Sequence, residues 1–390
     1  MAFHIITDSY FPYAGASSAR IDLYARAIIN AGENCSVITL CTLPSSMPYV
    51  SSEVYNGVPV HHLFSLWGSK LRICRIISRL IGGMKLLLYL LLSVHKRDSV
   101  IVYGFPSSLK KLIARTLKSR HIPCVCELCE YPWAWEEDSL EIERRRTDFF
   151  RRVLPLFSGV IVISEALRKV VVDCSNIPII KIPILIDPDV QIIEEAPPVS
   201  FPYIFHSGTL TERKDGGIGM IMAFARVKAM CNVSLKFIIT GKLNNSSEHQ
   251  KIRDIIRQCG IAEDVIFVGY LKSRELLIYQ RYCVAAIINK HDNLQNRYCF
   301  STKIGEYMNL ARPIITTCVG ESMLYLEDGK HAIVVPPESP ELIANALLRI
   351  MSDDQYARQL GLNGQSLAQT HFSYKLYGKN IIDFFDKLRR

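Results

Sequence analysis

Short apolar segments alternate with segments of helical periodicity along almost the whole chain. In the first half, strands are predicted at residues 3–7, 35–41, 58–63, 100–103, 123–128 and 160–164. These are nearly uninterrupted apolar runs, as is typical of parallel strands covered on both faces. Helical stretches such as 16–31, 107–119 and 139–156 lie between them. Alternation of this kind predicts an α/β fold with a doubly wound parallel sheet.

The alternation pauses at residues 186–202, where Pro188, Pro197, Pro198 and Pro202 are interspersed with acidic residues. This composition is typical of a linker. A second set of strands is predicted at 203–207, 235–240, 265–268, 284–289, 313–317 and 332–335. We therefore expect two Rossmann-like domains, 1–186 and 187–372. The closing segment 373–390 is amphipathic and is expected to pack back on the first domain.

Composition agrees with two folded domains and narrows the partners. The chain has 390 residues, of which 49% are hydrophobic and 21% charged, and this excludes a disordered chain. The formal net charge of +9 favours anionic partners such as a nucleotide diphosphate or an anionic lipid. Nucleic acid is not expected, because the charge is spread along the chain and no recognition motif is present.

The cysteines and the N-terminus predict a reducing, cytoplasmic location. The first residues, 1–7, form a strand-like run rather than a basic region followed by a long apolar one. The 12 cysteines are therefore expected to be free thiols. Cys124, Cys126 and Cys129 are the tightest cluster, but no fourth ligand stands at metal-site spacing, so buried strand thiols are favoured over zinc.

Residues 70–96 depart from the alternation, since Lys70, Arg72, Arg75, Arg79 and Lys85 stand among many leucines and isoleucines. The apolar run is too short to span a bilayer. A basic amphipathic helix can lie on an anionic membrane such as the inner face of the cell membrane. The alternative is a surface helix that covers the N-terminal sheet. Composition does not separate the two.

The first candidate site is the segment 207–216, which follows a predicted strand and leads into a predicted helix. Gly208 allows the backbone to approach a ligand closely, and Lys214 would add a positive charge for a phosphate. A plain turn with a solvated lysine would have the same sequence.

The second candidate site, 296–308, also lies between a strand and a helix. Ser301 or Thr302 can cap that helix, and the amides of Ser301, Thr302 and Lys303 would then form a phosphate-binding helix start. Glu306 follows one turn later, where a carboxylate could accept hydrogen bonds from a ribose diol. It could equally complement the helix dipole.

These motifs together resemble the C-terminal half of GT4-type retaining glycosyltransferases. The resemblance rests on Gly208-Thr209-Leu210 with Lys214, on the run 300–307, and on Ala311-Arg312-Pro313. It covers most of residues 203–352. It implies the GT-B architecture, in which two Rossmann-like domains face a cleft that holds the active site. It also implies a nucleoside-diphosphate sugar as donor, retention of the anomeric configuration, and no metal or other cofactor.

The resemblance also assigns roles to residues of this chain. Lys214 and Glu306 are expected to be catalytic. The expected donor-binding residues are Gly15, Ala16, Gly208, Thr209, Arg213, Gly241, Tyr270, Tyr298, Phe300, Ser301, Thr302 and Lys303. Two positions depart from the family pattern, because Thr209 stands where the family has arginine and Tyr298 where it has the first of two glutamates. Arg213 could replace the missing arginine.

The acceptor is expected on the N-terminal domain. Glu130, Tyr131 and Trp133 follow a predicted strand, and aromatic rings with a carboxylate suit a sugar. The alternative is that the tryptophans pack a lid.

The resulting hypothesis is transfer of a sugar to a growing cell-surface polysaccharide or lipid-linked glycan. Three alternatives stay open: a sugar-nucleotide-binding protein without activity, a scaffold of a glycan assembly complex, and a non-hydrolysing sugar-nucleotide epimerase.

Overall fold

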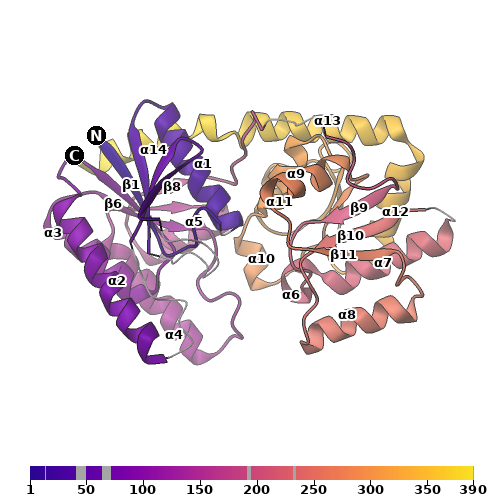
Figure 1. Cartoon of the computed structure of the whole chain (residues 1–390), viewed down its shortest axis with the longest axis horizontal. Coiled ribbons are helices and arrows are strands. Elements are labelled where there is room, and N and C mark those ends of the chain that lie inside the picture. The colour runs from indigo at the N-terminus through magenta and orange to yellow at the C-terminus, as the bar shows by residue number, and fades with distance from the viewer. Residues whose placement is uncertain (14, 41–49, 64–71, 191–194, 232–233, 390) are drawn as a thin grey trace. The chain divides into compact units, whose positions relative to one another are not determined.

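The computed structural model describes residues 1–13, 15–40, 50–63, 72–190, 195–231 and 234–389. Ala14, Cys41, Lys70 and the linker residues 191–194 therefore lie outside the described residues. Contacts divide the chain into two compact units, which we call unit 1 (Met1–Leu185 with Ser373–Arg390) and unit 2 (Ile186–Phe372). Figure 1 shows an α/β fold in each of them.

Unit 1 contains an eight-stranded sheet in the order β3-β4-β2-β1-β5-β6-β7-β8. Its strands are β1 (Ala2–Thr7), β2 (Asn34–Thr39), β3 (Ser52–Tyr55), β4 (Val58–His62), β5 (Ser99–Tyr103), β6 (Cys124–Leu128), β7 (Gly159–Val162) and β8 (Ile179–Lys181). All six strands predicted here are confirmed. Two more, β3 and β8, were not predicted.

The sheet is parallel except where β3 pairs antiparallel with β4. This departs from the all-parallel expectation, and it has a local cause. Asn56 and Gly57 join the two strands with positive φ angles of 50° and 80°, and Asn-Gly is the pair that favours a tight hairpin turn. The side chains of β3 alternate between exposed and half-buried positions, so the strand lacks the apolar run that marks the others.

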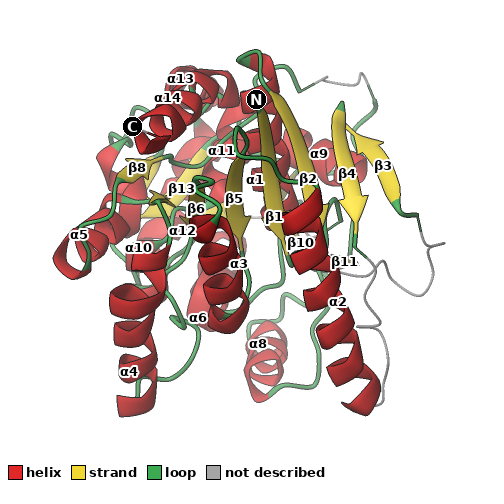
Figure 2. Ribbon diagram, turned by 90° about the vertical axis from the view of Figure 1, so that its left-hand side faces the viewer, coloured by secondary structure: helices red, strands yellow, loops and turns green. Residues whose placement is uncertain are grey.

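Helices cover both faces of this sheet. They are α1 (Ala16–Asn30), α2 (Arg72–Leu92), α3 (Ser107–Ser119), α4 (Leu140–Asp148), α5 (Glu165–Cys174) and α14 (Gly378–Arg389). Phe3 packs edge-to-face against Phe385 of α14, whereas its neighbour His4 accepts or donates a 3.0 Å hydrogen bond with Tyr89 of α2. Successive strand residues point to opposite faces, so α14 and α2 lie on opposite sides of the sheet. Figure 2 shows α2 and α3 in front of these strands.

The closing segment belongs to unit 1 because α14 packs on α1. The contact is very close at Gly378, where an added Cβ atom would lie 2.0 Å from the Ala27 carbonyl oxygen. Only glycine allows the two helix backbones to approach this far.

Unit 2 contains a six-stranded parallel sheet in the order β11-β10-β9-β12-β13-β14. Its strands are β9 (Tyr203–His206), β10 (Lys236–Thr240), β11 (Val265–Gly269), β12 (Ala286–Ile288), β13 (Ile314–Thr317) and β14 (Ile333–Val335). Each lies in a predicted segment, except that β11 extends one residue beyond it. The helices are α6 (Glu212–Asp215), α7 (Gly217–Met230), α8 (Ser247–Gln258), α9 (Ser273–Tyr282), α10 (Leu294–Tyr298), α11 (Thr302–Asn309), α12 (Pro340–Ser352) and α13 (Asp354–His371).

Each sheet has a point at which the strand order reverses. In unit 1 it lies between β1 and β5, and in unit 2 between β9 and β12. Loops after the two strands diverge there and leave a crevice at their carboxyl ends, which is where open α/β sheets bind ligands. The candidate ligand-binding residues are therefore those that follow these four strands.

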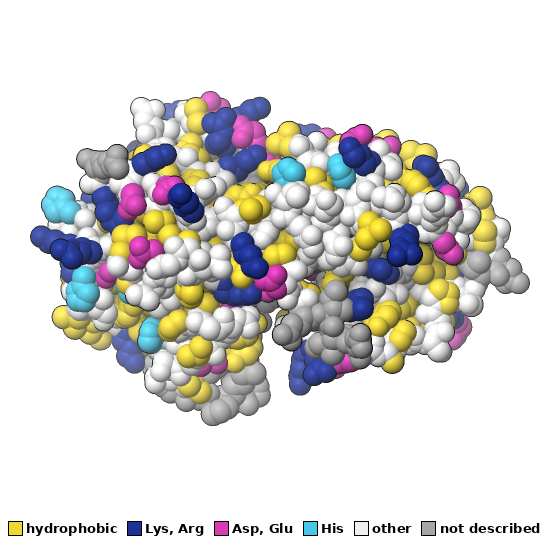
Figure 3. All heavy atoms as spheres, turned by 90° about the horizontal axis from the view of Figure 1, so that it is seen from above, with side chains coloured by type: hydrophobic (Ala, Val, Ile, Leu, Met, Phe, Trp, Pro, Cys, Tyr) yellow, Lys and Arg dark blue, Asp and Glu magenta, His cyan; other side chains and the backbone are white. Residues whose placement is uncertain are grey.

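Surface charge, helix composition and clusters of possible metal ligands concern what the chain could bind. Lys and Arg side chains are scattered among acidic ones over the face in Figure 3. Among the residues that the structure describes, none of the helices combines the length and apolar character that crossing a bilayer requires. In the same part of the chain, no three His, Cys, Asp or Glu side chains gather as metal ligands would. Cys124 and Cys126 are buried on β6, and burial raises the pKa of both thiols.

Candidate functional site

The reversal point of unit 2 is lined by the loop that follows β9. The amide of Gly208 donates a 2.6 Å hydrogen bond to Thr240 Oγ1 at the end of β10, which fixes the loop against the sheet. Gly208 has φ 128°, and a Cβ atom there would lie 3.2 Å from Lys303 Nζ. The glycine thus lets the ammonium group of a distant helix lie directly beside the loop.

Four polar side chains form a buried cluster at this point. Asp215 Oδ1 lies 2.8 Å from Lys303 Nζ and 3.1 Å from Lys290 Nζ. His206 Nε2 lies 3.4 Å from Lys303 Nζ. The Lys303 side chain keeps 18% of its surface exposed, whereas Asp215 and Lys290 keep 5% and 8%. Two ammonium groups therefore share one carboxylate, and Lys303 is the cation of the pair that reaches solvent.

The pKa shifts in the cluster follow from burial and charge. Burial would raise the pKa of Asp215, but the ammonium groups of Lys303 and Lys290 hold that pKa well below its usual range. Burial, reinforced by the charge of Lys303, lowers the pKa of His206 to about 3. Burial also lowers the pKa of Lys303, and Asp215 opposes this shift. At neutral pH, the cluster thus holds a neutral imidazole, one carboxylate and the lysines.

The chain turns sharply to bring Asp215 into the cluster. Gly216 adopts a left-handed conformation at φ 57° and separates the single turn of α6 from α7. Its carbonyl oxygen accepts a 2.8 Å hydrogen bond from Asn289 Nδ2. The segment 207–216 therefore leads from β9 into a helix as expected, with the short α6 and a break at Gly216 before α7. Because of the break, Asp215 points inward while Arg213 and Lys214 are exposed.

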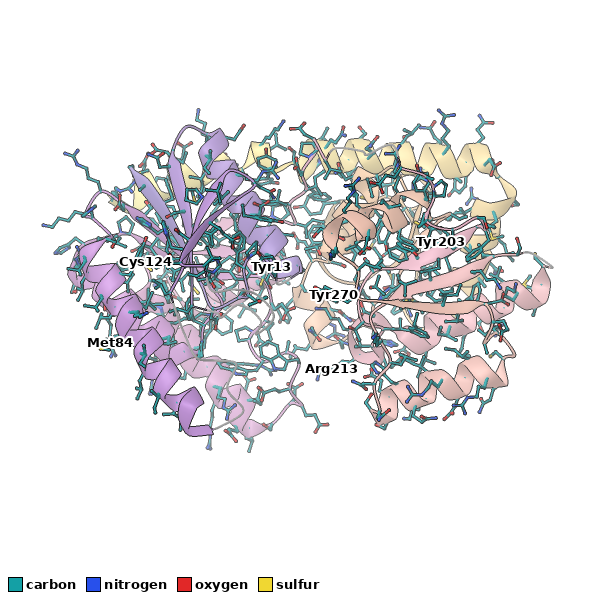
Figure 4. The ribbon with its side chains drawn as sticks, in the orientation of Figure 1. Tyr13, Met84, Cys124, Tyr203, Arg213 and Tyr270 are labelled. Atoms are coloured by element: carbon teal, nitrogen blue, oxygen red, sulfur yellow. The ribbon has the colours of Figure 1, made fainter. Side chains whose placement is uncertain are left out.

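Lys214 contributes to the cluster through its backbone. Its carbonyl oxygen accepts a 2.8 Å hydrogen bond from Lys290 Nζ. The carbonyl oxygen of Arg213 accepts one of 2.7 Å from Asn293 Nδ2. The loop after β12 therefore holds the backbone of both residues, whose side chains extend from the surface. Figure 4 labels Arg213 at the edge of unit 2.

The second predicted element, the start of α11, is also at this point. Ser301 occupies the N-cap position as expected, but no side-chain cap hydrogen bond is formed, which corrects that part of the expectation. The Ser301, Thr302 and Lys303 residues are half-buried. Amides of a first helical turn that lack a side-chain acceptor form a favourable site for an anion.

Glu306 lies one turn further along α11. Its Oε2 accepts a 2.8 Å hydrogen bond from Gln280 Nε2 of α9, and the Gln280 side chain is buried. This contact fixes the carboxylate and leaves Oε1 as the atom that could accept from sugar hydroxyls. The hydrogen bond to α9 distinguishes Glu306 from an acid that only complements the helix dipole.

The remaining expected donor residues differ in burial and in the contacts that they make. Gly241 donates a 2.7 Å hydrogen bond to Gly269, and its Cβ position is 3.2 Å from Thr209 Cα, so it belongs to the loop cluster. Thr209 and Tyr270 are exposed, and Tyr298 is half-buried. The Phe300 ring is 4% exposed and stacks on Tyr325, so its side chain packs in the core of unit 2.

The expected residues of unit 1 form a separate group. Gly15 has φ 60° at the N-cap of α1 and opens into space, and Ala16 is the first residue of that helix. Glu130 is half-buried. Tyr131 stacks on Phe150, and Trp133, at φ 54°, packs edge-to-face on Phe149. These ring contacts give both aromatic residues a packing role in unit 1. That they also bind an acceptor stays a prediction.

The reversal point of unit 1 carries residues that sequence reasoning missed. Asp8 Oδ1 accepts a 2.9 Å hydrogen bond from the amide of Phe105, which joins the ends of β1 and β5. A Cβ atom at Gly104 would lie 2.1 Å from the same oxygen. Burial raises the pKa of Asp8. Below this point, the buried Arg20 donates to Glu127 Oε1 at 2.8 Å and to the Pro183 carbonyl oxygen at 2.7 Å.

In unit 2, sequence reasoning found Lys303 and missed Asp215, Lys290 and His206. The available signal was positional, because His206 ends β9 and Lys290 follows β12 by two residues. The arrangement as a whole concentrates positive charge beside a helix start and a glycine loop. Positive charge at a helix start is an arrangement that favours phosphate groups.

Comparisons with known proteins show similarity in one segment of the sequence and in the fold. Residues 201–353 match the family model of glycosyl transferases group 1. No curated protein sequence matches the chain. Among solved structures, the chain resembles sucrose-phosphate synthase from Thermosynechococcus elongatus with a TM-score of 0.77 at 16% identity, over 100% of this chain and 99% of that one.

Two further structures give similar values. Anabaena HepE matches with a TM-score of 0.72 at 15% identity over 99% of both chains. A glycosyltransferase from Rickettsia africae matches with a TM-score of 0.70 at 12% identity, over 99% of this chain and 98% of that one. Identities this low show the fold alone, and the expected GT-B fold class is confirmed.

Proposed function

We propose that the chain is a glycosyltransferase that takes its sugar from a nucleoside-diphosphate sugar, on the premise that residues 201–353 form a domain of the group 1 glycosyl transferases. The observation that carries the proposal is the cationic cluster at the reversal point of unit 2. It lies inside the matched segment. The structures of Anabaena HepE with UDP and with UDP-glucose support the same class of donor.

The donor diphosphate would lie against Lys303, the Lys214 side chain and the first amides of α11. Cleavage of the bond between the sugar and the diphosphate leaves negative charge on the leaving phosphate. Positive groups fixed beforehand around that phosphate stabilise the transition state without a cost of reorganisation. Asp215, which is itself paired with Lys290, holds Lys303 in place for this task. Glu306 would accept hydrogen bonds from the ribose or the donor sugar.

Lys303 also accounts for the missing family arginine at position 209. Its ammonium group lies beside the Gly208 turn, only 3.2 Å from where a Cβ would stand. A cation thus reaches the Gly208-Thr209 turn from α11 instead of from the turn itself. On this basis we propose that the threonine at position 209 is compatible with activity.

The finer points of the reaction follow from the resemblance and are part of the proposal. Transfer would retain the anomeric configuration, and the lysines and amides would supply the positive charge without a resident metal. The acceptor would be a growing cell-surface polysaccharide or lipid-linked glycan, bound by residues of unit 1 such as Glu130. Activity that persists in a metal chelator would support the second of these points.

The test is a panel of nucleotide sugars offered to the wild type and to Lys303→Ala, with consumption of the donor and binding both measured. Lys379→Ala is a matched control, since Lys379 lies on the exposed side of α14 in the other unit. Turnover of one donor that falls at least tenfold in Lys303→Ala, and not in the control, supports the proposal. Equal turnover in both variants would refute the role of the cluster.

A second candidate is a donor-binding protein without activity. The observation that favours it is the pair of departures, Thr209 and Tyr298, from positions that carry charge in the family. Saturable binding of a nucleotide sugar without its consumption, with any acceptor offered, would select this candidate.

A further inference from the structure

Helix α2 presents an apolar face to solvent. Seven large apolar side chains on it are 45–72% exposed: Ile76, Ile77, Leu80, Met84, Leu88, Leu91 and Leu92. Leu80 and Leu92 reach 69% and 72%. Figure 4 labels Met84 on the side of α2 that faces away from the strands. Single exposed apolar residues are normal, but a continuous patch of them marks an interaction surface.

The exposed residues form one stripe. Ile76, Leu80, Met84, Leu88 and Leu92 follow each other at intervals of four residues. At about 100° and 1.5 Å per residue, they cover roughly 160° of the helix circumference over roughly 24 Å. We call this the α2 stripe.

The opposite side of α2 is firmly packed. Leu86 and Leu90 are fully buried, and Tyr89 makes its hydrogen bond to His4 of β1. The helix is therefore seated on the sheet by one face, and the α2 stripe is the other face.

Charge indicates what covers this stripe. Lys85 on α2 is exposed, as are Lys96 and Arg97 just after it, and the sequence of α2 contains no acidic residue. A second copy of the chain, stacked stripe against stripe, would bring these like charges together. An anionic lipid surface instead offers hydrocarbon to the stripe and negative headgroups to the basic residues.

We propose that α2 binds the surface of an anionic lipid bilayer, with the α2 stripe inserted among the lipids and the helix axis parallel to the membrane plane. The sequence left two alternatives open for this helix: that it lies on a membrane, or that it covers the sheet. The two are compatible, because the buried face of α2 covers the sheet while its exposed face is available to a membrane. The binding does not depend on the proposed transferase activity. It would place the enzyme at the membrane where a lipid-linked acceptor resides.

The test is co-sedimentation of the full chain with vesicles of phosphatidylcholine alone and of equal parts phosphatidylcholine and phosphatidylglycerol. The variant is Leu80→Gln with Met84→Gln and Leu88→Gln. The matched control replaces three exposed residues on other elements, Val172→Gln, Leu342→Gln and Leu376→Gln, which are 52%, 42% and 48% exposed. Circular dichroism establishes that both variants fold.

We expect the wild type and the control to bind the vesicles with phosphatidylglycerol, and the α2 variant to bind at least tenfold more weakly. Binding by the wild type should also weaken as salt is raised, because salt screens the basic residues. Failure of the wild type to bind, or equal binding by the α2 variant, would overturn the proposal. So would a wild-type dimer, seen by light scattering, that the α2 variant abolishes. Donor turnover, measured without vesicles, separates this outcome from failure of the transferase proposal.

Discussion

Replacing Asp215 by asparagine should destabilise unit 2 while leaving unit 1 unchanged. Asp215 is buried, and its Oδ1 lies 2.8 Å and 3.1 Å from two ammonium groups. Asparagine has the same shape, but it leaves Lys303 and Lys290 facing each other without a counter-charge. Removing one partner of a buried ion pair costs about 3–5 kcal/mol, because the remaining charge stays buried and unpaired.

The lower end of this range applies here. The asparagine oxygen still accepts a hydrogen bond from Lys303, so only the charge is lost. We therefore expect a decrease of about 3 kcal/mol in the free energy of unfolding of unit 2 at pH 7. The exposed pair of Asp254 with Arg257 on α8 offers a control. Asp254→Asn should change the free energy of unfolding by less than about 1 kcal/mol.

Urea unfolding measures both variants. Trp133 and Trp135 lie in unit 1, and no tryptophan stands among the residues of unit 2, 186–372. Tryptophan fluorescence therefore does not report unit 2, whereas far-UV circular dichroism reports the whole chain. Asp215→Asn should shift the circular dichroism transition and leave the fluorescence transition in place. The reasoning would be refuted if the variant unfolded with the wild-type midpoint, or if only the fluorescence transition moved.

The pH dependence provides a further check on the same variant. The folded-state pKa of Asp215 is far below that of the unfolded chain. Its contribution is therefore fully present above the unfolded-state pKa of about 4 and falls as the pH drops below it. The difference in stability between wild type and Asp215→Asn should be constant from pH 5 to 8 and shrink below pH 4. A difference that grows on acidification would contradict the assignment.

Three more predictions follow from single residues. Gly216→Ala should lower the free energy of unfolding of unit 2 by about 2 kcal/mol, since φ is 57° and the new Cβ would lie 2.3 Å from Asn289 Nδ2; Gly260→Ala, at a positive φ with open space around it, should cost clearly less. Glu127→Gln, which leaves Arg20 buried without its counter-charge, should cost about 3 kcal/mol and shift tryptophan fluorescence, and an unchanged fluorescence midpoint would argue against it. The pKa of His206 is lowered to about 3 in the folded protein, so below the unfolded-state pKa of about 6.5 the unfolded chain binds a proton that the folded chain does not. As the pH falls below about 6.5, the stability of the wild type should therefore decrease by up to about 1.4 kcal/mol per pH unit relative to His206→Gln. Parallel pH profiles of the two proteins would contradict this.

The strands could be predicted because parallel strands that are buried on both faces consist of nearly continuous apolar residues. Each of the predicted segments overlaps a strand. The strand β3 was missed for the opposite reason, since it lies at the edge of the sheet and alternates exposed with half-buried residues. Local turn chemistry, the Asn56-Gly57 pair, was the available signal for it.

The site could be predicted only in its local parts. Gly208 and the start of α11 are visible in the sequence because a glycine loop and a helix cap each depend on neighbouring residues. The partner of Lys303 is Asp215, 88 positions earlier in the chain. Nothing local to either residue indicates the pair, because the fold of the sheet brings them together. The same holds for Phe300, whose core position depends on its contact with Phe372.

The most direct test of the central claim is a hydrogen-exchange footprint of a nucleoside diphosphate on the full chain. We predict that a diphosphate such as UDP slows exchange in peptides that cover residues 206–216 and 289–306, and that Lys303→Ala removes this protection. Unit 2 also has a cavity of about 470 Å³ at the amino ends of its strands, lined in part by Pro202, Leu235, Arg312 and Arg358. Protection confined to peptides around that cavity, or no protection by any diphosphate, would contradict the assignment of the donor site to the cationic cluster.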